Sequence, residues 1–383
     1  MKKLFYFAAA AVALAACAKN EVIPVNSGEN QEITFNVAPK TKADDAHRHK
    51  SFEPGKEFAS WAYYLPKDNT WDANSSSAKE YISGATISYN TTDNVWKAGQ
   101  SYYWPKDGGS LTFFAYSLNK ENLDFKTVNV EGSNVKRSTV VCHSNTGIFA
   151  HIDLSVDKNV DFLVADPAKD KKSNVDEGKH FVDGVPTLFR HKLSYVIFNV
   201  KTDKNYSVEK KTFTLKSIKF NNVSNVGGYR DFPSTTAPII KAGFTPDGVT
   251  TVNYTSGSAE SFAQVITSEN SGISPVDNFL YIPQTFADNA TIEVVYTITT
   301  TVGSGTVTET VTETVTKTIN LKDLFPKTYD TVDHTKVISE GWEMGKKYTI
   351  NLTFTLDEIL WDPAVQDWED VNIGTDTAPI IVG

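Results

Sequence analysis

Apolar and polar side chains alternate along much of the chain, which is the period-2 pattern of half-buried β-strands. The pattern begins at Glu32–Val37 and is cleanest at Tyr348–Leu356. Similar runs lie between these two, at Ala85–Tyr89, Leu111–Tyr116, Val160–Val164, Tyr195–Val200, Phe213–Phe220, Phe279–Ile282 and Ile292–Ile298. β-branched and aromatic residues fill these runs, and the helical period is weak throughout. The pattern therefore predicts an all-β protein.

One hairpin is predicted in detail, with arms at Ile292–Thr301 and Thr306–Ile319. The turn between them, residues 302–305, contains two glycines, and these permit the positive φ angles of a tight reversal. The second arm repeats Thr-Val-Thr-Glu, so valines and glutamates share one face and threonines occupy the other. Charged side chains among the valines favour an edge strand that resists further pairing.

The N-terminal segment reads MKKLFYFAAAAVALAAC, with two lysines, a short apolar stretch and then Cys17. Residues 1–16 are typical of a secretory signal peptide, because the apolar stretch is too short to span a bilayer. Its ending resembles a bacterial lipobox, in which Cys17 is lipidated, and an ordinary cleaved signal is the alternative. We expect residues 17–31 to form a lipidated polar tether that holds an exported protein by its acyl chains.

Length and composition predict two globular domains. The chain has 383 residues, of which 40% are hydrophobic and 22% are charged, and this composition excludes disorder or a coiled coil as the main architecture. Residues 166–184 are rich in Lys, Asp and Gly, and a new apolar strand opens after Pro186. We therefore predict one β-sandwich at 32–186 and a second at 187–383.

Charge and the reactive residue types argue against several classes of function. The formal net charge is −9 and becomes more negative once the signal peptide is removed, so nucleic-acid binding is not expected. Cys142 is the only cysteine besides Cys17, which excludes an internal disulfide and a multi-cysteine metal site, and we expect it to be a buried, inert residue. His47 and His49 lie in a loop-like stretch, and no familiar catalytic motif occurs. We expect no enzymatic activity, no metal and no cofactor.

Several segments, in chain order, carry a family resemblance. They are the lipobox at Cys17, Glu32–Val37, Ser101–Pro105 leading into Leu111–Tyr116, Asp161–Ala165, Phe189–Ser194 with Val196–Val200, and Gly345–Tyr348 with Trp361–Pro363 and Asp367–Trp368. This ordered set resembles the fimbrillin superfamily, which comprises pilus subunits and pilus-associated lipoproteins of Bacteroidales.

The resemblance implies two tandem transthyretin-like β-sandwich domains and a structural pilus subunit that serves adhesion. It also implies assembly by strand exchange. The precursor reaches the outer membrane as a lipoprotein, and an Arg-specific or trypsin-like protease removes the first strand. The C-terminal strand of another subunit then fills the groove, which makes an extracellular fimbrium. The implied partners are other pilus subunits, the protease, the outer membrane through the lipid anchor, and a host or bacterial surface ligand.

The two exchangeable strands can be assigned to residues. The removable strand carries the inward residues Ile33, Phe35 and Val37. The candidate donor strand is the C-terminal segment 371–383, with the apolar residues Val371, Ile373, Ile380, Ile381 and Val382. The alternative is that this segment is simply the last strand of the second sandwich, and Pro379 counts slightly against a fully paired strand.

The candidate cleavage site is the bond between Arg48 and His49, in a polar stretch just after the first strand. Arg48 is the only arginine between Cys17 and Arg137. The alternative is that Arg48 is an ordinary loop residue of an uncleaved anchor or accessory protein.

The main alternative function is glycan binding by a surface lipoprotein. A pilus tip or anchor protein would combine ligand binding with a place in the pilus. The aromatic residues that could stack on sugar rings are Trp61, Trp71, Trp96, Trp104, Tyr63, Tyr64, Tyr102 and Tyr103. Large aromatic residues in β-sandwiches usually pack in the core. We therefore expect these side chains to serve packing.

Overall fold

A computed structural model describes residues 31–37, 56–118, 138–144, 147–173, 184–233, 242–304, 307–325, 328–329 and 337–368. Most of these residues lie in strands, which confirms the predicted all-β class. The helical segments among them are α1 (Trp71–Asn74), η1 (Ser75–Ser77) and α2 (Leu321–Leu324), each about one turn long. None of the described helices is long and apolar enough to cross a membrane.

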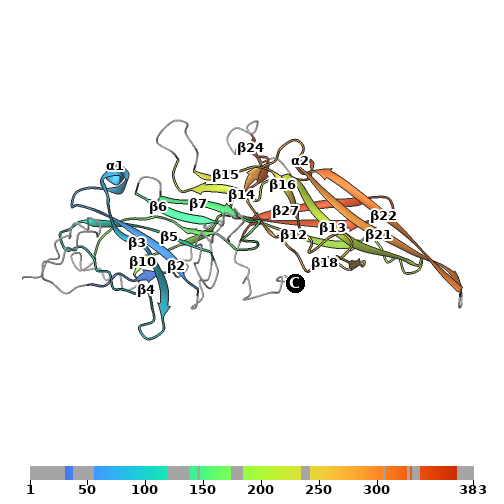
Figure 1. Cartoon of the computed structure of the whole chain (residues 1–383), viewed down its shortest axis with the longest axis horizontal. Coiled ribbons are helices and arrows are strands. Elements are labelled where there is room, and N and C mark those ends of the chain that lie inside the picture. Colours follow the sequence, from blue (N-terminus) through green and yellow to red (C-terminus); the bar gives the residue numbers. More distant parts are fainter. Residues whose placement is uncertain are drawn as a thin grey trace, which may run out of the picture.

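A nine-stranded sheet occupies the end of the elongated molecule that holds the N-terminal strands (Figure 1). Its order is β10 (Val185–Pro186), β1 (Phe35–Asn36), β4 (Val95–Ala98), β3 (Lys79–Asn90), β2 (Phe58–Leu65), β5 (Ser110–Ser117), β8 (Leu163–Ala165) and β11 (Phe189–His191), with β9 (Ala168–Lys171) beside β5. Phe58 of β2 lies 5.9 Å from the ring of Trp96 and 5.3 Å from that of Phe189. Because these partners come from opposite halves of the strand order, the sheet curves around one of its faces.

That face encloses a hydrophobic core, which we call the curved-sheet core. Its largest members are Phe35, Phe58, Phe113, Phe189, Tyr64, Trp96 and Trp104. The first strand of the chain contributes Ile33, Phe35 and Val37 to this core. Residues 31–37 are therefore part of the packing of this core, as expected for the first strand.

A four-stranded sheet covers the other face of the curved sheet. Its order is β15 (Gly243–Pro246), β14 (Val226–Arg230), β7 (Gly147–Asp153) and β6 (Thr139–His143). Between the two sheets lies a second core, the middle core, which contains Tyr63, Phe114, Tyr116, Ile148, Phe162, Leu193, Tyr229, Ile282 and Trp368 among others. Pairing crosses residue 186, since β14 pairs with β7 and β11 with β8. The predicted domain boundary near Pro186 stays a prediction.

Two five-stranded sheets form the opposite end of the molecule (Figure 1). One has the order β18 (Ser271–Gly272), β12 (Ser194–Thr202), β26 (Lys346–Phe354) and β27 (Ile359–Asp367), with β19 (Leu280–Tyr281) beside β12. The other has the order β16 (Thr250–Asn253), β13 (Lys211–Val223), β21 (Thr291–Ser304) and β22 (Val307–Asn320), with β17 (Gln264–Ile266) beside β13. Their inner faces meet in a C-terminal core, where the rings of Tyr296 and Phe354 lie 4.9 Å apart. This is the sandwich arrangement that strict alternation predicts.

The predicted hairpin is confirmed, and its paired strands extend further than expected. β21 and β22 pair continuously from Thr291 opposite Asn320 to Ser304 opposite Val307, so residues 302–304 belong to the strand. The sequence suggested a turn there because of its glycines, yet Gly303 adopts a φ of +118° within the paired strand. β22 ends the strand order of its sheet, as expected for an edge strand. Two small sheets, β20 (Gln284–Thr285) with β25 (Gly341–Trp342) and β23 (Thr328–Tyr329) with β24 (Val337–Ser339), complete the described strands.

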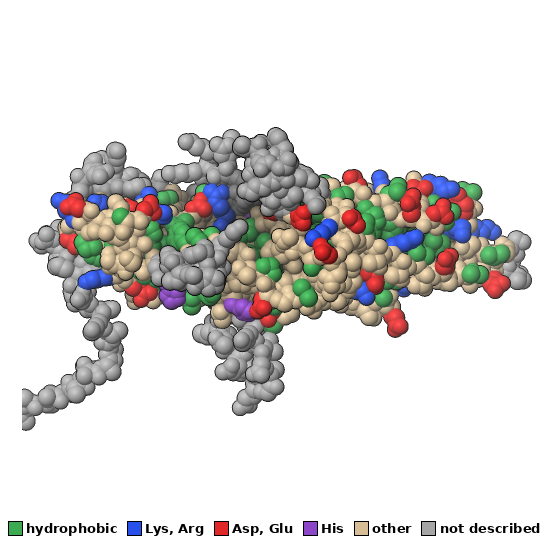
Figure 2. Space-filling view, turned by 90° about the horizontal axis from the view of Figure 1, so that it is seen from above, with side chains coloured by type: hydrophobic (Ala, Val, Ile, Leu, Met, Phe, Trp, Pro, Cys, Tyr) green, Lys and Arg blue, Asp and Glu red, His purple; other side chains and the backbone are tan. Residues whose placement is uncertain are grey.

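Charged side chains of both signs are spread over the face seen in Figure 2. Acidic and basic residues alternate along the C-terminal half of this face and form no large patch of one sign there.

Candidate functional site

The first described segment, residues 31–37, lies between two other parts of the curved sheet. β1 pairs in parallel with β10 and antiparallel with β4. On the β10 side, the backbone N–H of Val185 donates to the carbonyl of Thr34 at 2.7 Å. On the other side, the N–H of Ile33 donates to the carbonyl of Tyr102 at 2.7 Å. The segment therefore has backbone partners along both edges, as an inner strand of a sheet does.

These backbone bonds continue toward both ends of the segment. The N–H of Trp104 donates to the carbonyl of Gln31 at 3.0 Å. The N–H of Thr187 donates to the carbonyl of Asn36 at 2.8 Å. The slot that holds residues 31–37 is thus lined by β10 on one side and by β4 and the stretch after it on the other.

Polar side chains at the rim of the slot add weaker contacts. The hydroxyl of Ser101 donates to Oε1 of Glu32 at 2.6 Å, and Nζ of Lys97 lies 3.9 Å from Oε2 of the same carboxylate. The pKa of Lys97 is raised, mainly by its hydrogen bond to Asp93 and to a smaller extent by Glu32. All these groups are partly exposed, so solvent screens them and they contribute little to holding the strand.

Three alternate side chains of the segment point into the curved-sheet core. Ile33, Phe35 and Val37 are 2%, 4% and 9% exposed. The ring of Phe35 packs edge-to-face against Phe58 at 5.6 Å and against Phe113 at 5.9 Å. All three residues have the inward orientation expected from the sequence. That this strand is removable stays a prediction.

Gly184 allows β10 to approach the first strand. Its φ is +77°, and a Cβ built there would lie 2.7 Å from the carbonyl carbon and oxygen of Thr34. A larger residue would therefore require the two backbones to move apart. This neighbour strand was not predicted, because two residues, Val185–Pro186, are too few to show alternation. A glycine directly before an apolar residue was the one local signal.

The other sequence-predicted sites lie outside the described residues. These are the lipidation residue Cys17, the cleavage residues Arg48 and His49, and the donor residues Val371, Ile373, Ile380, Ile381 and Val382. The described part of the chain ends at Trp368.

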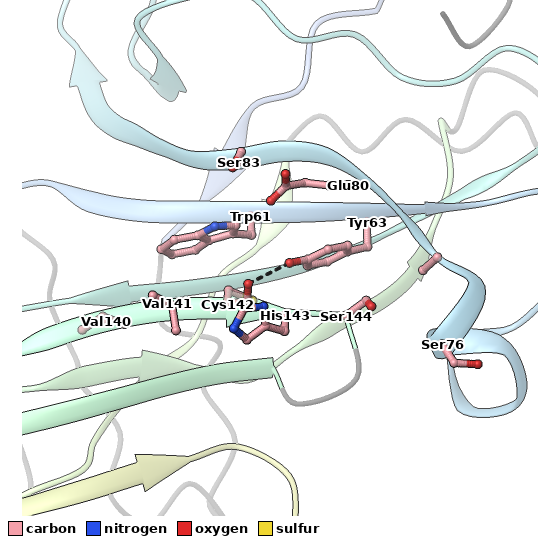
Figure 3. A pocket seen from close by; sticks show the side chains of 11 residues that line it. Trp61, Tyr63, Ser76, Glu80, Ser83, Val140, Val141, Cys142, His143 and Ser144 are labelled. Atoms are coloured by element: carbon pink, nitrogen blue, oxygen red, sulfur yellow. Dashed lines mark hydrogen bonds between the residues drawn. The ribbon is translucent and has the colours of Figure 1, made fainter. Parts of the chain in front are cut away.

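A cleft of about 690 Å³ opens between the two sheets of the N-terminal half, beside the edge strand β6 (Figure 3). The hydroxyl of Tyr63 donates to the carbonyl of Cys142 at 3.0 Å. The lining residues are Trp61, Tyr63, Ser76, Ala78, Glu80, Ser83 and Val140 to Ser144. Burial raises the pKa of both the Tyr63 hydroxyl and the Cys142 thiol, so both groups stay protonated near neutral pH. A buried, protonated thiol fits the inert role expected for Cys142.

Most of the aromatic residues considered for glycan binding pack in the cores. Those that are buried are Trp71, Trp96, Trp104, Tyr63 and Tyr64. Trp61 is half-buried, and its ring stacks on Tyr116 at 5.7 Å and lies against Gly84, where an added Cβ would come within 3.0 Å of the ring. Tyr102 is half-buried and Tyr103 is 38% exposed. The sequence-based expectation that these residues serve packing therefore holds for most of them.

A family model described as fimbrillin-like matches residues 41–368. Among solved structures, a fimbrial protein from Bacteroides vulgatus is 17% identical with a TM-score of 0.53, and the match covers 88% of this chain and 100% of that one. A candidate cell adhesion protein from Bacteroides uniformis is 14% identical with a TM-score of 0.47, covering 88% and 99%. The tip fimbrial protein Mfa3 from Porphyromonas gingivalis is 11% identical with a TM-score of 0.37, covering 88% and 100%. Only the first of these exceeds a TM-score of 0.5, and at such identity it indicates a shared fold alone. No curated protein matches the chain significantly.

Proposed function

The chain belongs to the fimbrillin-like family, and we propose that it is a pilus subunit that polymerises by exchange of its first strand. Family membership supports a structural role in a surface fimbrium, with other pilus subunits as partners, and not an enzymatic one. The proposal adds three finer steps. These are anchoring of the precursor in the outer membrane through lipidated Cys17, proteolytic release of the first strand, and its replacement by a strand from a neighbouring subunit.

The observation that carries the proposal is the double-sided slot around residues 31–37. Loss of this segment would expose the part of the curved-sheet core that Ile33, Phe35 and Val37 fill. At roughly 1.5–3 kcal/mol for each large apolar side chain, the three together stabilise the fold by about 5–9 kcal/mol. Backbone donors on both sides of the slot would also lose their acceptors. An emptied slot is therefore a strong acceptor for another strand of matching pattern.

The C-terminal sequence contains one segment with the matching pattern. The slot takes apolar side chains at three alternate positions, and Ala378, Ile380 and Val382 have this spacing. In that register the side chain of Ile381 points away from the core, because successive side chains of a strand alternate between faces. The other apolar set in the segment is Val371 and Ile373, followed in the same register by the polar Thr375.

Pro379 is compatible with this register if the donor runs in the same direction as the first strand. It would then stand at the position of Thr34, whose carbonyl accepts the hydrogen bond from Val185. Proline keeps its carbonyl and lacks only the N–H. The proline that argues against an ordinary inner strand thus leaves this bond in place.

Cleavage after Arg48 would separate the slot-filling segment from the rest of the fold. Arg48 lies in the sequence between residues 31–37 and β2, so a cut there leaves the first strand attached only to the lipidated N-terminal part. The sheet partners of the strand would remain in the other fragment.

The test uses the precursor without its signal peptide, treated with a protease specific for arginine. We expect SDS-resistant ladders on gels and a new N-terminus at His49. Arg48→Gln should give no ladder, and Arg48→Lys, which keeps the positive charge, should behave like Arg48→Gln with this protease. Equal ladders from Arg48→Gln, or an N-terminus of the assembled material other than His49, would overturn the proposed cleavage step.

Glycan binding and a tip or anchor role remain the alternative functions, and no feature of the described residues favours them over a shaft subunit. The aromatic side chains that a glycan site would need are largely packed away. A candidate donor strand whose apolar pattern matches the slot favours a subunit within the shaft, because a terminal subunit has less need to donate.

A further inference from the structure

A large buried side chain lies directly after β27. Among the described strands, β27 is the last in its sheet order and pairs with β26. Trp368 follows directly, with 1% of its surface exposed. Its backbone N–H donates to the carbonyl of Gly345 at 2.8 Å, and the N–H of Gly345 in turn donates to the carbonyl of Leu193 at 2.9 Å. The start of β26 and the end of β27, which lie side by side, are therefore tied to the residue just before β12.

The indole of Trp368 stacks on rings from both halves of the molecule. It lies 3.8 Å from the ring of His191 with an interplanar angle of 14°, and 5.3 Å from that of Tyr195 with an angle of 23°. His191 ends β11 of the curved sheet, and Tyr195 belongs to β12 of a C-terminal sheet. Trp368 therefore sits where the two halves meet, in the middle core.

A buried hydrogen-bonded pair fixes the imidazole ring of this stack. Nδ1 of His191 lies 2.7 Å from Oδ2 of Asp161, and the side chains of both residues are 1% exposed. A hydrogen bond between two such groups holds the imidazole ring in one orientation, because breaking it would leave a buried polar group without its partner. The face of His191 on which Trp368 rests is thus fixed.

β27 also carries exposed apolar side chains, although Ile359 is buried and Trp361 packs against the C-terminal core. Leu360 is 50% exposed and Val365 is 44% exposed, although both are large apolar residues. Pro363 lies in the middle of the strand, opposite Ile350, and contributes no N–H. An edge strand with exposed side chains opens locally at a lower free energy than the strands buried in a core.

We propose that Trp368 is an anchor that fixes the end of β27, and with it the point from which the chain continues into residues 369–383. Tension on that segment then acts first on the buried indole and not on the hydrogen bonds of β27. The use of the anchor under tension rests on the proposed strand exchange, whereas the anchoring itself does not.

Hydrogen exchange measured by mass spectrometry on the uncleaved precursor tests the anchor. We expect Trp368→Ala to raise the hydrogen-exchange rate of residues 359–367 by at least about 100-fold. Truncation of a buried Trp lowers the folding equilibrium constant by several factors of ten. Exchange in β2 and β5 should stay within a few-fold of the wild type. Trp368→Phe, which keeps a ring over His191, should restore most of the protection.

The matched control is Ile282→Ala, which empties a fully buried position of the same middle core without touching the end of β27. It should not loosen residues 359–367 selectively. The anchor is refuted if Trp368→Ala leaves these residues protected as in the wild type, or if Ile282→Ala loosens them equally. Where Trp368→Ala fails to fold, Trp368→Leu keeps an apolar side chain without the stack and carries the same expectation. All variants are measured as uncleaved monomers, so a failure of strand exchange would not alter the outcome.

Discussion

Replacing Phe35 by alanine in the uncleaved precursor tests how strongly the first strand is held. Phe35 is 4% exposed and packs edge-to-face against two phenylalanines of the curved-sheet core. Truncation of a buried Phe to Ala typically costs about 3–5 kcal/mol, which covers both the lost burial and the cavity left behind. This is about half of the roughly 5–9 kcal/mol assigned to the three buried side chains of the strand.

Thermal unfolding of the precursor measures this loss. At about 2–4 °C for each kcal/mol, Phe35→Ala should lower the Tm by roughly 6–20 °C. Thr34→Ala is the matched control, because its side chain is only half-buried and points away from that core, and it should change stability by no more than about 0.5 kcal/mol. Equal shifts for the two variants would refute the idea that this strand is held by its inward side chains.

The same substitution also tests the proposed exchange. In the proposed polymer residues 31–37 are gone, so Phe35→Ala should not change the stability of cleaved, assembled material. A polymer destabilised by Phe35→Ala would show that the first strand is retained after assembly. The pair of measurements therefore separates the packing argument from the exchange argument.

Three further predictions follow from the same residues. In ladder assays after cleavage, Ile380→Asp should abolish assembly because it puts a charge into the curved-sheet core. Ile381→Asp should assemble normally. Equal behaviour of the two variants would rule out the proposed register. Gly184→Ala should release the first strand, because the added Cβ meets Thr34 and a left-handed backbone costs alanine about 1–2 kcal/mol more than glycine. Hydrogen exchange of residues 31–37 should therefore rise in the precursor. Burial lowers the pKa of Lys347, so the charged form disfavours folding at neutral pH, and Lys347→Met should raise stability there by up to about 1 kcal/mol. As pH rises from the pKa of Lys347 in the folded protein toward its pKa in the unfolded chain, the wild type regains stability. The difference in unfolding free energy between Lys347→Met and the wild type, measured by urea titration, should therefore shrink at alkaline pH.

The strands could be read from the sequence because their pattern is local. The run expected at Tyr348–Leu356 corresponds to β26 at Lys346–Phe354, and the inward residues Ile33, Phe35 and Val37 have the predicted burial. In both places one face of the strand is buried, so the alternation of residue types records the fold directly.

The partners of those strands could not be read in the same way, because pairing joins residues far apart in the chain. The two-residue strand β10 is too short for a period, yet it closes one side of the slot. β14 lies beyond the predicted boundary at Pro186 but pairs with β7. The role of Trp368 also depends on contacts with His191 and Tyr195, some 170 residues earlier, which no local pattern reveals.

The slot also explains why cleavage, rather than simple opening, would control assembly. While the chain between the first strand and β2 is uncut, the strand rebinds its slot as a tethered segment, at an effective concentration that can reach the millimolar range. A strand from another subunit at lower concentration cannot compete with it. Cutting the connection makes rebinding of the first strand a reaction between separate molecules, so a strand that leaves can be lost. A donor strand that buries a similar apolar surface then replaces the first strand if it dissociates more slowly. An anchored tail on the neighbouring subunit would hold that donor strand to its own fold.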